Sequence, residues 1–474
     1  MIEKKKYSVL LSVGHFCADI NAGCLAALLP FLIAAYHYDY GTAALLVMAS
    51  NLVGSAVQLV FGGLADRRNM PAMMLIGIVM SGAGMALVGV TDSFVMMCAA
   101  AMVSGTGIAM FHPQAMKLLN QITVRGEEGN DVSIFSFGGN LGVSLGPVAV
   151  TACVKALGLK GTLLLLIPPA VSILLFCGKG RALMRPVPDE DRMSGSEGLP
   201  DREGLPDREG LRDGEGSGET GQDDGKTLTG SERKQTVIEE KLTVIEEKLM
   251  GSERKQMAIE EKQMGAEGKR TTIEEKPARA DKAAGRDQWS AFWLLTVVIF
   301  GRSIVAGSLN TFMSLYWIEE LGQSETVGNA ALSIFYALTA LLTLVGGHLA
   351  DRYGYRSMTK WSLAMLTPAL FLFSFTHSVV AAAVLLLPLS AGLSISYSPI
   401  VVLGQKYLPH HTGFASGVTL GLSSSVGAVM TPVLGRAADA SGMGTALCIV
   451  AVISVAPLIV SFLLKEVNEV DFSS

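Results

Sequence analysis

The stretch Gly62-Gly63-Leu64-Ala65-Asp66-Arg67-Arg68 occurs a second time, with small changes, as Gly346-Gly347-His348-Leu349-Ala350-Asp351-Arg352. The two copies are separated by 351 − 66 = 285 positions. Each copy ends a long apolar segment, and the same separation relates Gly142 to Gly427. A long apolar chain that repeats itself once is typical of membrane transporters built from two related halves. The sequence therefore predicts two membrane bundles of similar architecture.

The composition places the chain in a membrane. Half of the 474 residues are hydrophobic, and the mean hydropathy of +0.43 is too high for a soluble protein of this length. Charge is concentrated between positions 181 and 287, which hold 20 of the 37 Lys and Arg residues and 26 of the 42 Asp and Glu residues. We therefore expect an N-terminal six-helix bundle (1–180), a charged low-complexity cytoplasmic linker (181–288) and a C-terminal six-helix bundle (289–474).

Each apolar block divides into six segments of about 20 residues, long enough to cross a bilayer as helices. The first block gives 8–34, 42–64, 71–90, 94–117, 131–156 and 160–178, and the second gives 289–316, 327–350, 357–375, 378–404, 411–438 and 443–464. The predicted fold class is an all-α membrane protein with twelve transmembrane helices in two six-helix repeats. Basic residues gather in alternate short loops, which places both termini and the linker in the cytoplasm.

Several classes of function are excluded by missing motifs. The six cysteines are scattered, and no metal-ligand spacing, phosphate-binding loop or nucleophile motif occurs. We therefore expect no enzymatic activity, no cofactor, no metal and no use of ATP. The net charge of −5 arises in the linker and does not indicate a nucleic-acid partner. The linker itself is expected to be solvated and largely disordered.

The repeated loop resembles a family signature. Its second copy continues as Tyr353-Gly354-Tyr355-Arg356, and the two copies together resemble the loop signature of the major facilitator superfamily. Three stretches are similar to the fosmidomycin-resistance branch of that superfamily: Gly14–Asp19, Gly105–Pro113 and Ser133–Gly142. The resemblance implies two six-helix halves around a central cavity, drug efflux coupled to proton entry, and a monomer in the bacterial inner membrane. Its partners would be a small-molecule substrate, protons and the lipid bilayer.

The repeated loops are predicted to act in gating. An aspartate and an arginine at a helix end can pair with a neighbouring helix and hold one gate conformation. The first copy departs from the family pattern by continuing as Asn69-Met70-Pro71. The residues assigned to this motif are Gly62, Asp66, Arg67, Gly347, Asp351, Arg352 and Arg356.

Asp19 is the candidate for proton coupling. A carboxylate within a membrane span is costly unless it is paired, protonated or in contact with water. His15 lies four residues earlier and therefore on the same helical face. Such a pair could load and release a proton, or it could be a static hydrogen-bonded pair that fixes helix packing. Relatives often carry a glutamate where this chain has Gln114; if that glutamate carries protons, this chain must use another carboxylate, and Asp19 is the obvious one.

Arg302 in the seventh span is near the repeat equivalent of Asp19, since 19 + 285 = 304. The superfamily resemblance puts the first, fourth, seventh and tenth spans around the cavity. An arginine there could bind an anionic substrate or pair with Asp19, or it could extend to the cytoplasmic interface. His112, Gln114 and Asn140 are further candidates for substrate binding on the cavity wall.

The predicted function is secondary active transport by alternating access. We expect export of a small toxic compound, an anion being one option, in exchange for protons. Uptake of a small organic acid or sugar is the alternative within transport. Outside transport, the alternative is a membrane sensor or scaffold that has kept the fold. The presence of Asp19 and Arg302 disfavours that last alternative.

Overall fold

The computed structural model describes residues 2–67, 70–123, 128–178, 287–411, 414–415 and 417–465, and every structural statement below refers to these residues. Within them, the side chains of residues 2–5, 59, 66–67, 128–130, 351 and 420 lie outside the description. The chain divides into two units, Met1–Asp189 with Ala283–Ser474, and Glu190–Lys282. The second unit lies outside the described residues, so the predicted nature of the linker stays a prediction.

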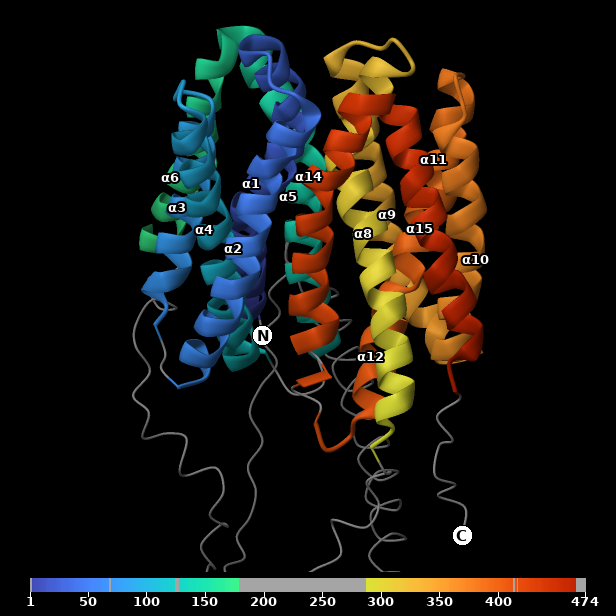
Figure 1. Cartoon of the computed structure of the whole chain (residues 1–474). Helices are drawn as coiled ribbons and strands as arrows, with labels where there is room; N and C mark the ends of the chain where they lie inside the picture. Colours follow the sequence, from blue (N-terminus) through green and yellow to red (C-terminus); the bar gives the residue numbers. More distant parts are fainter. Residues whose placement is uncertain are drawn as a thin grey trace, which may run out of the picture. The chain divides into compact units, whose positions relative to one another are not determined.

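The described residues form helices and connecting loops, with no strand among them, which confirms the all-α fold class. Figure 1 shows the helices side by side as an upright bundle. The N-terminal half contains α1 (Ile2–Tyr36), α2 (Tyr40–Arg67), α3 (Ala72–Val88), α4 (Phe94–Ile122), α5 (Glu128–Leu157), the 3-10 helix η1 (Gly158–Leu166) and α6 (Ile167–Gly178). The C-terminal half contains α8 (Trp289–Glu319), α9 (Glu325–Tyr353), α10 (Tyr355–Ser374), α11 (Val379–Ile395), α12 (Tyr397–Tyr407), the π-helix η3 (Gly417–Leu422), α14 (Ser423–Ser441) and α15 (Met443–Leu463).

Nine segments of the described residues are long and apolar enough to cross a membrane. The predicted count of twelve is not reached on this criterion, for three reasons. First, Asp131–Gly178 counts as one segment although it runs through α5, η1 and α6. Second, the helix α3 has only 17 residues. Third, the helix α10 is not among the nine. The number twelve therefore stays a prediction, while the multi-pass architecture is clear.

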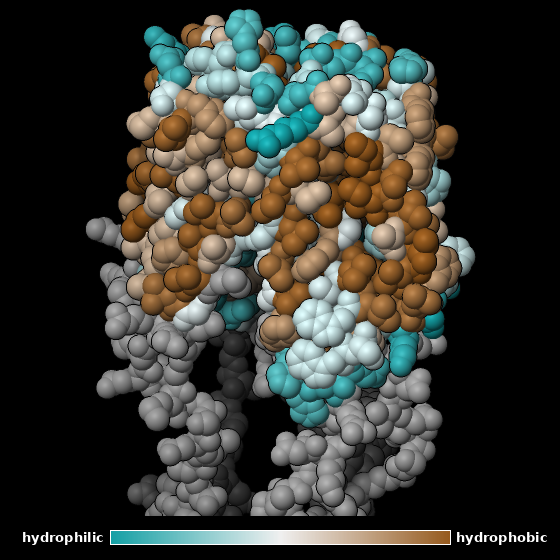
Figure 2. All heavy atoms as spheres, in the orientation of Figure 1, coloured by the Kyte–Doolittle hydropathy of each residue, from teal (hydrophilic) through white to brown (hydrophobic). Residues whose placement is uncertain are grey.

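The outer surface has the pattern of a membrane protein. Figure 2 shows the apolar residues of the visible face in a band across the bundle, with hydrophilic residues at both ends. Large apolar side chains such as Val95, Leu174 and Val380 are more than 70% exposed. This exposure would be unfavourable in water, but it is favourable against lipid acyl chains.

In each half, the first and fifth spans pack against each other at a glycine of the fifth span. A Cβ atom at Gly142 of α5 would collide with the Phe16 carbonyl oxygen of α1, and a Cβ atom at Gly427 of α14 would collide with the Ser303 carbonyl oxygen of α8. A glycine lets two membrane helices approach this closely. The pair of glycines that reveals the sequence repeat therefore has the same packing role in each half.

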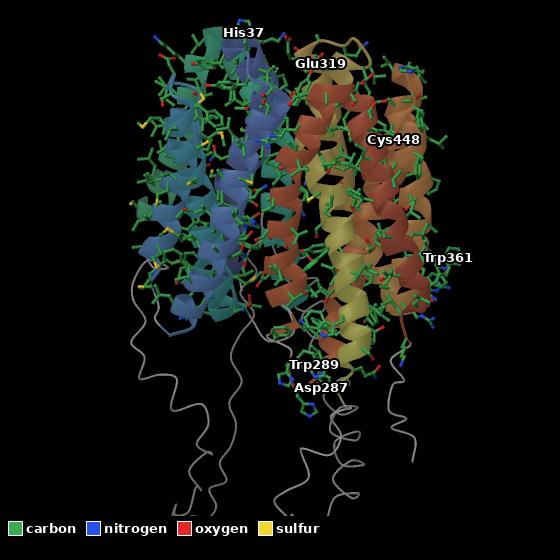
Figure 3. All side chains as sticks on the ribbon, in the orientation of Figure 1. His37, Asp287, Trp289, Glu319, Trp361 and Cys448 are labelled. Carbon is green, nitrogen blue, oxygen red and sulfur yellow. The ribbon has the colours of Figure 1, made fainter. Side chains whose placement is uncertain are left out.

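The two halves share most of their apolar contact toward one end of the bundle, and α2 and α14 also meet farther along, where the hydroxyl groups of Ser55 and Ser424 are 2.9 Å apart. His37 and Glu319 mark the end with the shared apolar contact, and Asp287 and Trp289 mark the opposite one (Figure 3). One hydrophobic core runs through both halves, and its N-terminal members come from the helix segments next to the His37 end: 24–47, 85–101 and 150–165. A second core, around Phe111 and two further phenylalanines, belongs to the N-terminal half alone. The halves therefore share a core near His37 and have separate cores farther along.

Polar contacts reinforce the junction at the His37 end. Asp439 of α14 accepts hydrogen bonds from the backbone N–H groups of Tyr40 (2.7 Å) and Gly41 (3.0 Å) at the start of α2. A carboxylate is favourable at a helix N-terminus, where N–H groups lack helical partners. Lys155 of α5 forms an ion pair with Glu325 of α9 at 3.3 Å. Contacts between the halves thus close the bundle at this end.

Candidate functional site

A cavity of about 730 Å³ lies between the halves and is lined by residues of α1, α2, α4, α5, α8, α9, α11, α12, η3 and α14. This volume suits a small molecule. Of the described residues that line it, only His112 and Arg302 have a basic or acidic side chain (Lys, Arg, His, Asp or Glu). Five side-chain amides also line it: Asn21, Asn51, Gln58, Asn140 and Asn310.

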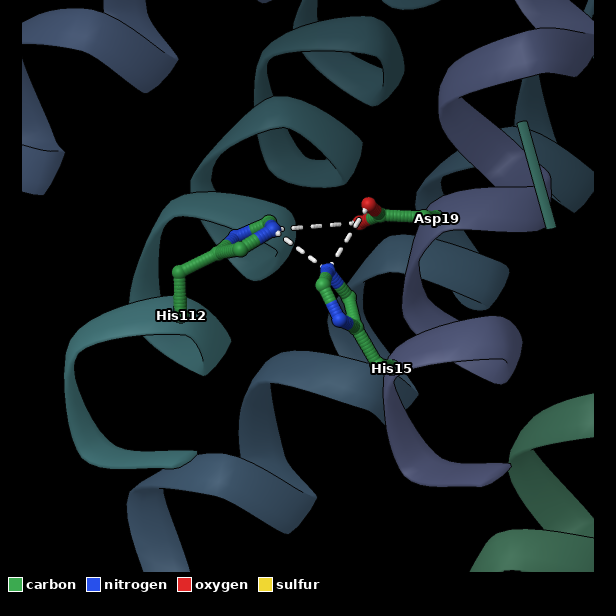
Figure 4. Close-up of side chains that lie close together, drawn as sticks. All are labelled: His15, Asp19 and His112. Carbon is green, nitrogen blue, oxygen red and sulfur yellow. Dashed lines mark hydrogen bonds and ion pairs between the residues drawn. The ribbon is translucent and has the colours of Figure 1, made fainter. Parts of the chain in front are cut away.

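Three titratable side chains converge beside the cavity (Figure 4). The Nε2 atom of His15 lies 3.1 Å from Oδ2 of Asp19, and the Nε2 atom of His112 lies 3.4 Å from Oδ1 of Asp19. The two Nε2 atoms are 3.1 Å apart. The side chains of His15 and Asp19 are 10% and 12% exposed, whereas that of His112 is 30% exposed and lines the cavity. The predicted pair on α1 is present, and His112 of α4 joins it.

Packing and backbone contacts hold the two imidazole rings. The His15 ring stacks on Phe135 of α5, with centroids 4.1 Å apart and planes inclined by 26°. A Cβ atom at Gly139 would collide with this ring, so the glycine leaves the space that the imidazole occupies. The Nδ1 atom of His15 lies 2.9 Å from the Phe135 carbonyl oxygen, and that of His112 lies 2.8 Å from the Ile108 carbonyl oxygen. Both Nε2 atoms therefore face Asp19.

Arg302 of α8 lies on the cavity wall of the C-terminal half. Its Nη2 donates to the Leu393 carbonyl oxygen at 2.6 Å, and its Nε lies 3.2 Å from the same oxygen and 3.0 Å from Oγ of Ser396. The guanidinium carbon is 5.4 Å from the ring centroid of Tyr397. These partners mark the break between α11 and α12, where helix carbonyl groups lack N–H partners and favour a cation.

Of the three environments expected for Arg302, the pairing with Asp19 and the extension to the cytoplasmic interface are wrong. It does not pair with Asp19, because the carbonyl groups at the helix break hold the guanidinium and the two histidines hold the carboxylate. It does not extend to the cytoplasmic interface, since it lines the cavity. The interruption of the tenth span at Ser396 is absent from the sequence prediction. Pro399, in the first turn of α12, does not by itself predict the break, because prolines such as Pro113 and Pro388 lie inside continuous helices.

The remaining substrate candidates are placed differently. Asn140 lines the cavity, and its role in binding stays a prediction. Gln114 is only 2% exposed and is not among the residues that line the cavity. Its Oε1 accepts a hydrogen bond from the backbone N–H of Met70 at 3.3 Å, because this side of α4 faces the segment that precedes α3. The expected position of Gln114 on the cavity wall is therefore wrong.

The gating motif is described only in part. A Cβ atom at Gly62 or Gly347 would meet no atom within 4 Å. The guanidinium of Arg352 lies over the ring of the tyrosine that follows it, and Nη2 of Arg356 donates to the Phe462 carbonyl oxygen at 3.4 Å. The gating role stays a prediction. The motif side chains outside the described ones are Asp66, Arg67 and Asp351.

The three-residue cluster could not be assembled from the sequence alone. His112 is 97 positions from His15, and no local spacing joins them. The available signal was the run of small residues around Gly139, which indicates a close approach of two helices. The ligand atoms of the cluster lie within 4.8 Å of one another, close enough to share a cation. Their separations of 3.1 to 3.4 Å are also those of hydrogen bonds, which shared protons would form.

Comparison with known proteins identifies relatives along nearly the whole chain. The family model of the Major Facilitator Superfamily matches residues 11–432. The chain is 23% identical over 464 residues to the MFS-type transporter YfnC of Bacillus subtilis (strain 168), covering 97% of this chain and 93% of that protein. It is 22% identical over 431 residues to the fosmidomycin resistance protein of Escherichia coli (strain K12), covering 90% of this chain and 85% of that protein.

Solved structures with the same fold are also transporters. A bacterial homologue of the human lysosomal transporter Spinster, in an inward-facing and occupied conformation, gives a TM-score of 0.66 at 13% identity, covering 98% of this chain and 97% of that chain. A mutant of the nucleoside transporter NupG gives a TM-score of 0.64 at 12% identity, covering 97% of this chain and 100% of that chain. At these identities the likeness concerns the fold alone.

Proposed function

This chain belongs to the Major Facilitator Superfamily of membrane transporters, and we propose that it couples the movement of a small anion to the movement of protons. One observation carries the proposal. A cavity between the halves is lined by a permanent cation, Arg302, and by His112, which contacts the Asp19 carboxylate and His15 behind the cavity wall. Secondary transport needs both a substrate site and a coupling site within reach of one cavity.

The anionic character of the substrate rests on Arg302. Its hydrogen-bond partners, the Leu393 carbonyl oxygen and the Ser396 hydroxyl, carry no charge. The cavity lining that is described contains no carboxylate that could neutralise the guanidinium. A partly desolvated cation without a counter-ion favours binding of an anion, and the planar guanidinium suits a carboxylate or a phosphonate. We propose Asn140 and His112 as further contacts for the substrate.

The proton-coupling role rests on Asp19 and His15. A buried carboxylate held against imidazole rings can accept and release protons as access to water alternates. The shared core near His37 and the Asp439 contacts close one end of the bundle in this conformation. Alternating access would open these contacts and close the other end, where we propose that the gating motif acts.

Two directions of transport are compatible with this coupling. The name of the Escherichia coli relative supports export of a toxic anion in exchange for protons, with a phosphonate as the substrate class. The cavity itself favours a second candidate, uptake of an organic anion together with protons. Its described lining contains two groups that attract an anion when protonated, His112 and Arg302. It contains no carboxylate, so the substrate and the proton would not compete there for one binding group, as exchange would require.

The test is flux into proteoliposomes under an imposed pH gradient. The panel would contain fosmidomycin, small carboxylates and neutral analogues of similar size. We expect at least one anion to move against its own gradient when the pH gradient is present, and the neutral analogues not to move. Movement of neutral compounds only, or movement that ignores the pH gradient, would contradict the proposal.

A further inference from the structure

We propose that His15, Asp19 and His112 form a two-proton site, in which His15 holds the first proton, His112 takes the second from the cavity, and this second proton and an anion at Arg302 stabilise each other. The inference rests on the proposed function and specifies how its two sites are coupled. It also gives His112, first considered as a substrate contact, a role in proton binding.

The backbone fixes where the ring protons lie. The Nδ1 atoms of His15 and His112 lie 2.9 and 2.8 Å from the carbonyl oxygens of Phe135 and Ile108. A carbonyl oxygen only accepts hydrogen bonds, so each Nδ1 carries a proton and donates it. In a neutral imidazole with Nδ1 protonated, Nε2 presents a lone pair. Both Nε2 atoms, each with a lone pair, therefore lie within 3.4 Å of an Asp19 oxygen and 3.1 Å from each other.

At least one further proton must lie in the cluster. Without it, four acceptor atoms, the two Nε2 atoms and the two Asp19 oxygens, would meet in three contacts of 3.1 to 3.4 Å with no hydrogen in any of them, an arrangement that is repulsive. A proton on His15 Nε2 satisfies both of the 3.1 Å contacts, to Asp19 Oδ2 and to His112 Nε2. A proton on Asp19 would satisfy only one of them. The longest contact, 3.4 Å between His112 and Asp19, is the one left without a hydrogen.

The second proton has a defined place. Oδ1 of Asp19 is buried and has no hydrogen-bond partner. Protonation of His112 at Nε2 would supply a donor to this oxygen, and the N–H of His15 would then donate to Oδ2 of Asp19 alone, because a protonated Nε2 cannot accept. The side chain of His112 is 30% exposed and lines the cavity, whereas His15 lies behind it with 10% exposure. A proton from cavity water therefore reaches His112 first, forms an N–H bond at Nε2 and leaves the water with one proton fewer.

Few other charges act on the cluster. The helices α3 and α6 contain no Asp, Glu, Lys, Arg or His, and neither do the described side chains of α2. With one proton the cluster is neutral, because the imidazolium and carboxylate charges cancel, and with two it carries one positive charge. The other described titratable or charged groups on the elements packed around it are Lys6, Tyr7, Cys17, Cys24 and Tyr36 on α1, Cys98 and Lys117 on α4, Asp131, Cys153 and Lys155 on α5, and Cys177 on α6. Lys117, the cation nearest in sequence to His112, donates to the Ala65 carbonyl oxygen, and Arg302 and Tyr336 face the cluster across the cavity from α8 and α9.

The coupling to the anion follows from this charge. His112 and Arg302 line the same cavity. An anion held there lowers the free energy of the doubly protonated cluster, and the second proton raises the affinity for the anion by the same factor. Ligands that bind together cross together, so the coupling favours symport over exchange. Exchange would require proton and anion to weaken each other's binding.

The test is nitrogen NMR of the full-length protein in lipid nanodiscs, with ring-labelled histidine, between about pH 9 and pH 5, the range that spans ordinary histidine titration. We expect one imidazolium signal to persist at the alkaline end and to disappear in His15→Gln. The chain has seven histidines, and of the further imidazolium signals that form as the pH falls, one should disappear in His112→Gln. The control is His377→Gln, which removes an exposed ring outside the cluster and should leave both signals in place.

Several results would overturn the proposal. Two neutral rings at the alkaline end would show that no shared proton exists. Persistence of both signals in Asp19→Asn would show that the carboxylate does not organise them. A bound metal found by elemental analysis, with signals altered by a chelator, would show a metal site instead.

Failure of this inference can be told from failure of the proposed function. If His112→Gln keeps pH-driven anion flux while Asp19→Asn loses it, the transport proposal stands and the role of His112 is wrong. If no anion of the panel responds to a pH gradient, the transport proposal fails. The NMR titration then still decides whether the cluster takes two protons.

Discussion

The two halves hold opposite charges at nearly equivalent places of the repeat, and they balance them differently. Asp19 of α1 faces His15 and His112, each of which can gain or lose a proton. Arg302 of α8 faces the Leu393 carbonyl group and a serine hydroxyl, neither of which changes its charge. The N-terminal half therefore carries a charge that changes with protonation, and the C-terminal half carries a constant one. We propose from this difference that the N-terminal half carries the proton site and that the C-terminal half supplies the constant charge for the anion.

The local backbone explains why the halves differ. In the N-terminal half, α1 and α5 are continuous helices, and Gly139 gives His15 the space to reach Asp19 from the same helix. In the C-terminal half, the tenth span is interrupted between α11 and α12, and the freed carbonyl groups hold Arg302. An unbroken helix thus supports the titratable cluster, and a broken helix supports the fixed cation.

The largest effect is expected from Asp19→Asn. The variable charge would be lost, because an amide does not titrate and cannot hold an imidazolium as a carboxylate does. Anion flux driven by a pH gradient should fall to the level of protein-free liposomes, with an unchanged amount of protein in the membrane. The matched control is Asp92→Asn, which alters a carboxylate in the loop between α3 and α4. Wild-type flux in Asp19→Asn would remove this residue from the mechanism.

Substitution of Arg302 should change the affinity for anions. A charge-assisted hydrogen bond contributes about 1.5–3 kcal/mol, so Arg302→Lys should weaken anion binding about tenfold and Arg302→Gln about a hundredfold or more. Binding would be measured for anionic and neutral members of the panel, with Lys160→Gln at an exposed position as control. Equal weakening for both classes of ligand in Arg302→Gln would show that Arg302 is structural.

Gly139→Ala tests the packing that positions His15. The added methyl group would collide with the imidazole ring, and overpacking of this kind costs about 1–3 kcal/mol. We expect pH-driven flux to fall about tenfold, the scale of effect that displacement of a functional group produces. Gly178→Ala is the matched control, because a Cβ atom there meets nothing within 4 Å. Equal flux in the two variants would show that the position of His15 is not critical.

The smallest effect is expected at the junction of the halves. Asp439→Asn removes a charge from the N-terminus of α2, which is worth about 1 kcal/mol at a partly exposed site and shifts a two-state population about fivefold. Distances between spin labels at Asp92→Cys and Thr326→Cys, on a background without native cysteines, would report opening at the His37 end. Asp287→Asn is the control, because Asp287 contacts His410 and His411 within its own half, at the opposite end of the bundle (Figure 3). Equal distance distributions in both variants would show that Asp439 does not hold the junction.

Much of the fold follows from the sequence because repeats and apolar periodicity are local properties. The helix α15 (Met443–Leu463) closely matches the predicted span 443–464, and the glycine pair that reveals the repeat has the predicted equivalence in space. The His15–Asp19 pair was also predictable, because a spacing of four residues places both side chains on one helical face. These features need only the geometry of a single helix.

The rest of the site depends on contacts between helices. His112 reaches Asp19 only because α1 packs against both α4 and α5, and no spacing along the chain encodes that distance. The partners of Arg302 come from an interrupted span, which hydropathy alone reads as continuous. Gln114 was misplaced for the opposite reason: it neighbours the site in sequence, but it lies on another face of α4.

The central claim is that proton and anion binding reinforce each other across the two halves. The most direct measurement is the pH change when an anion selected by the flux panel is added to the detergent-solubilised protein in unbuffered solution near neutral pH. Binding should take up as much as about one proton per anion and raise the pH, and the uptake should vanish in His112→Gln. Release of protons on binding, or binding without any pH change, would contradict the claim.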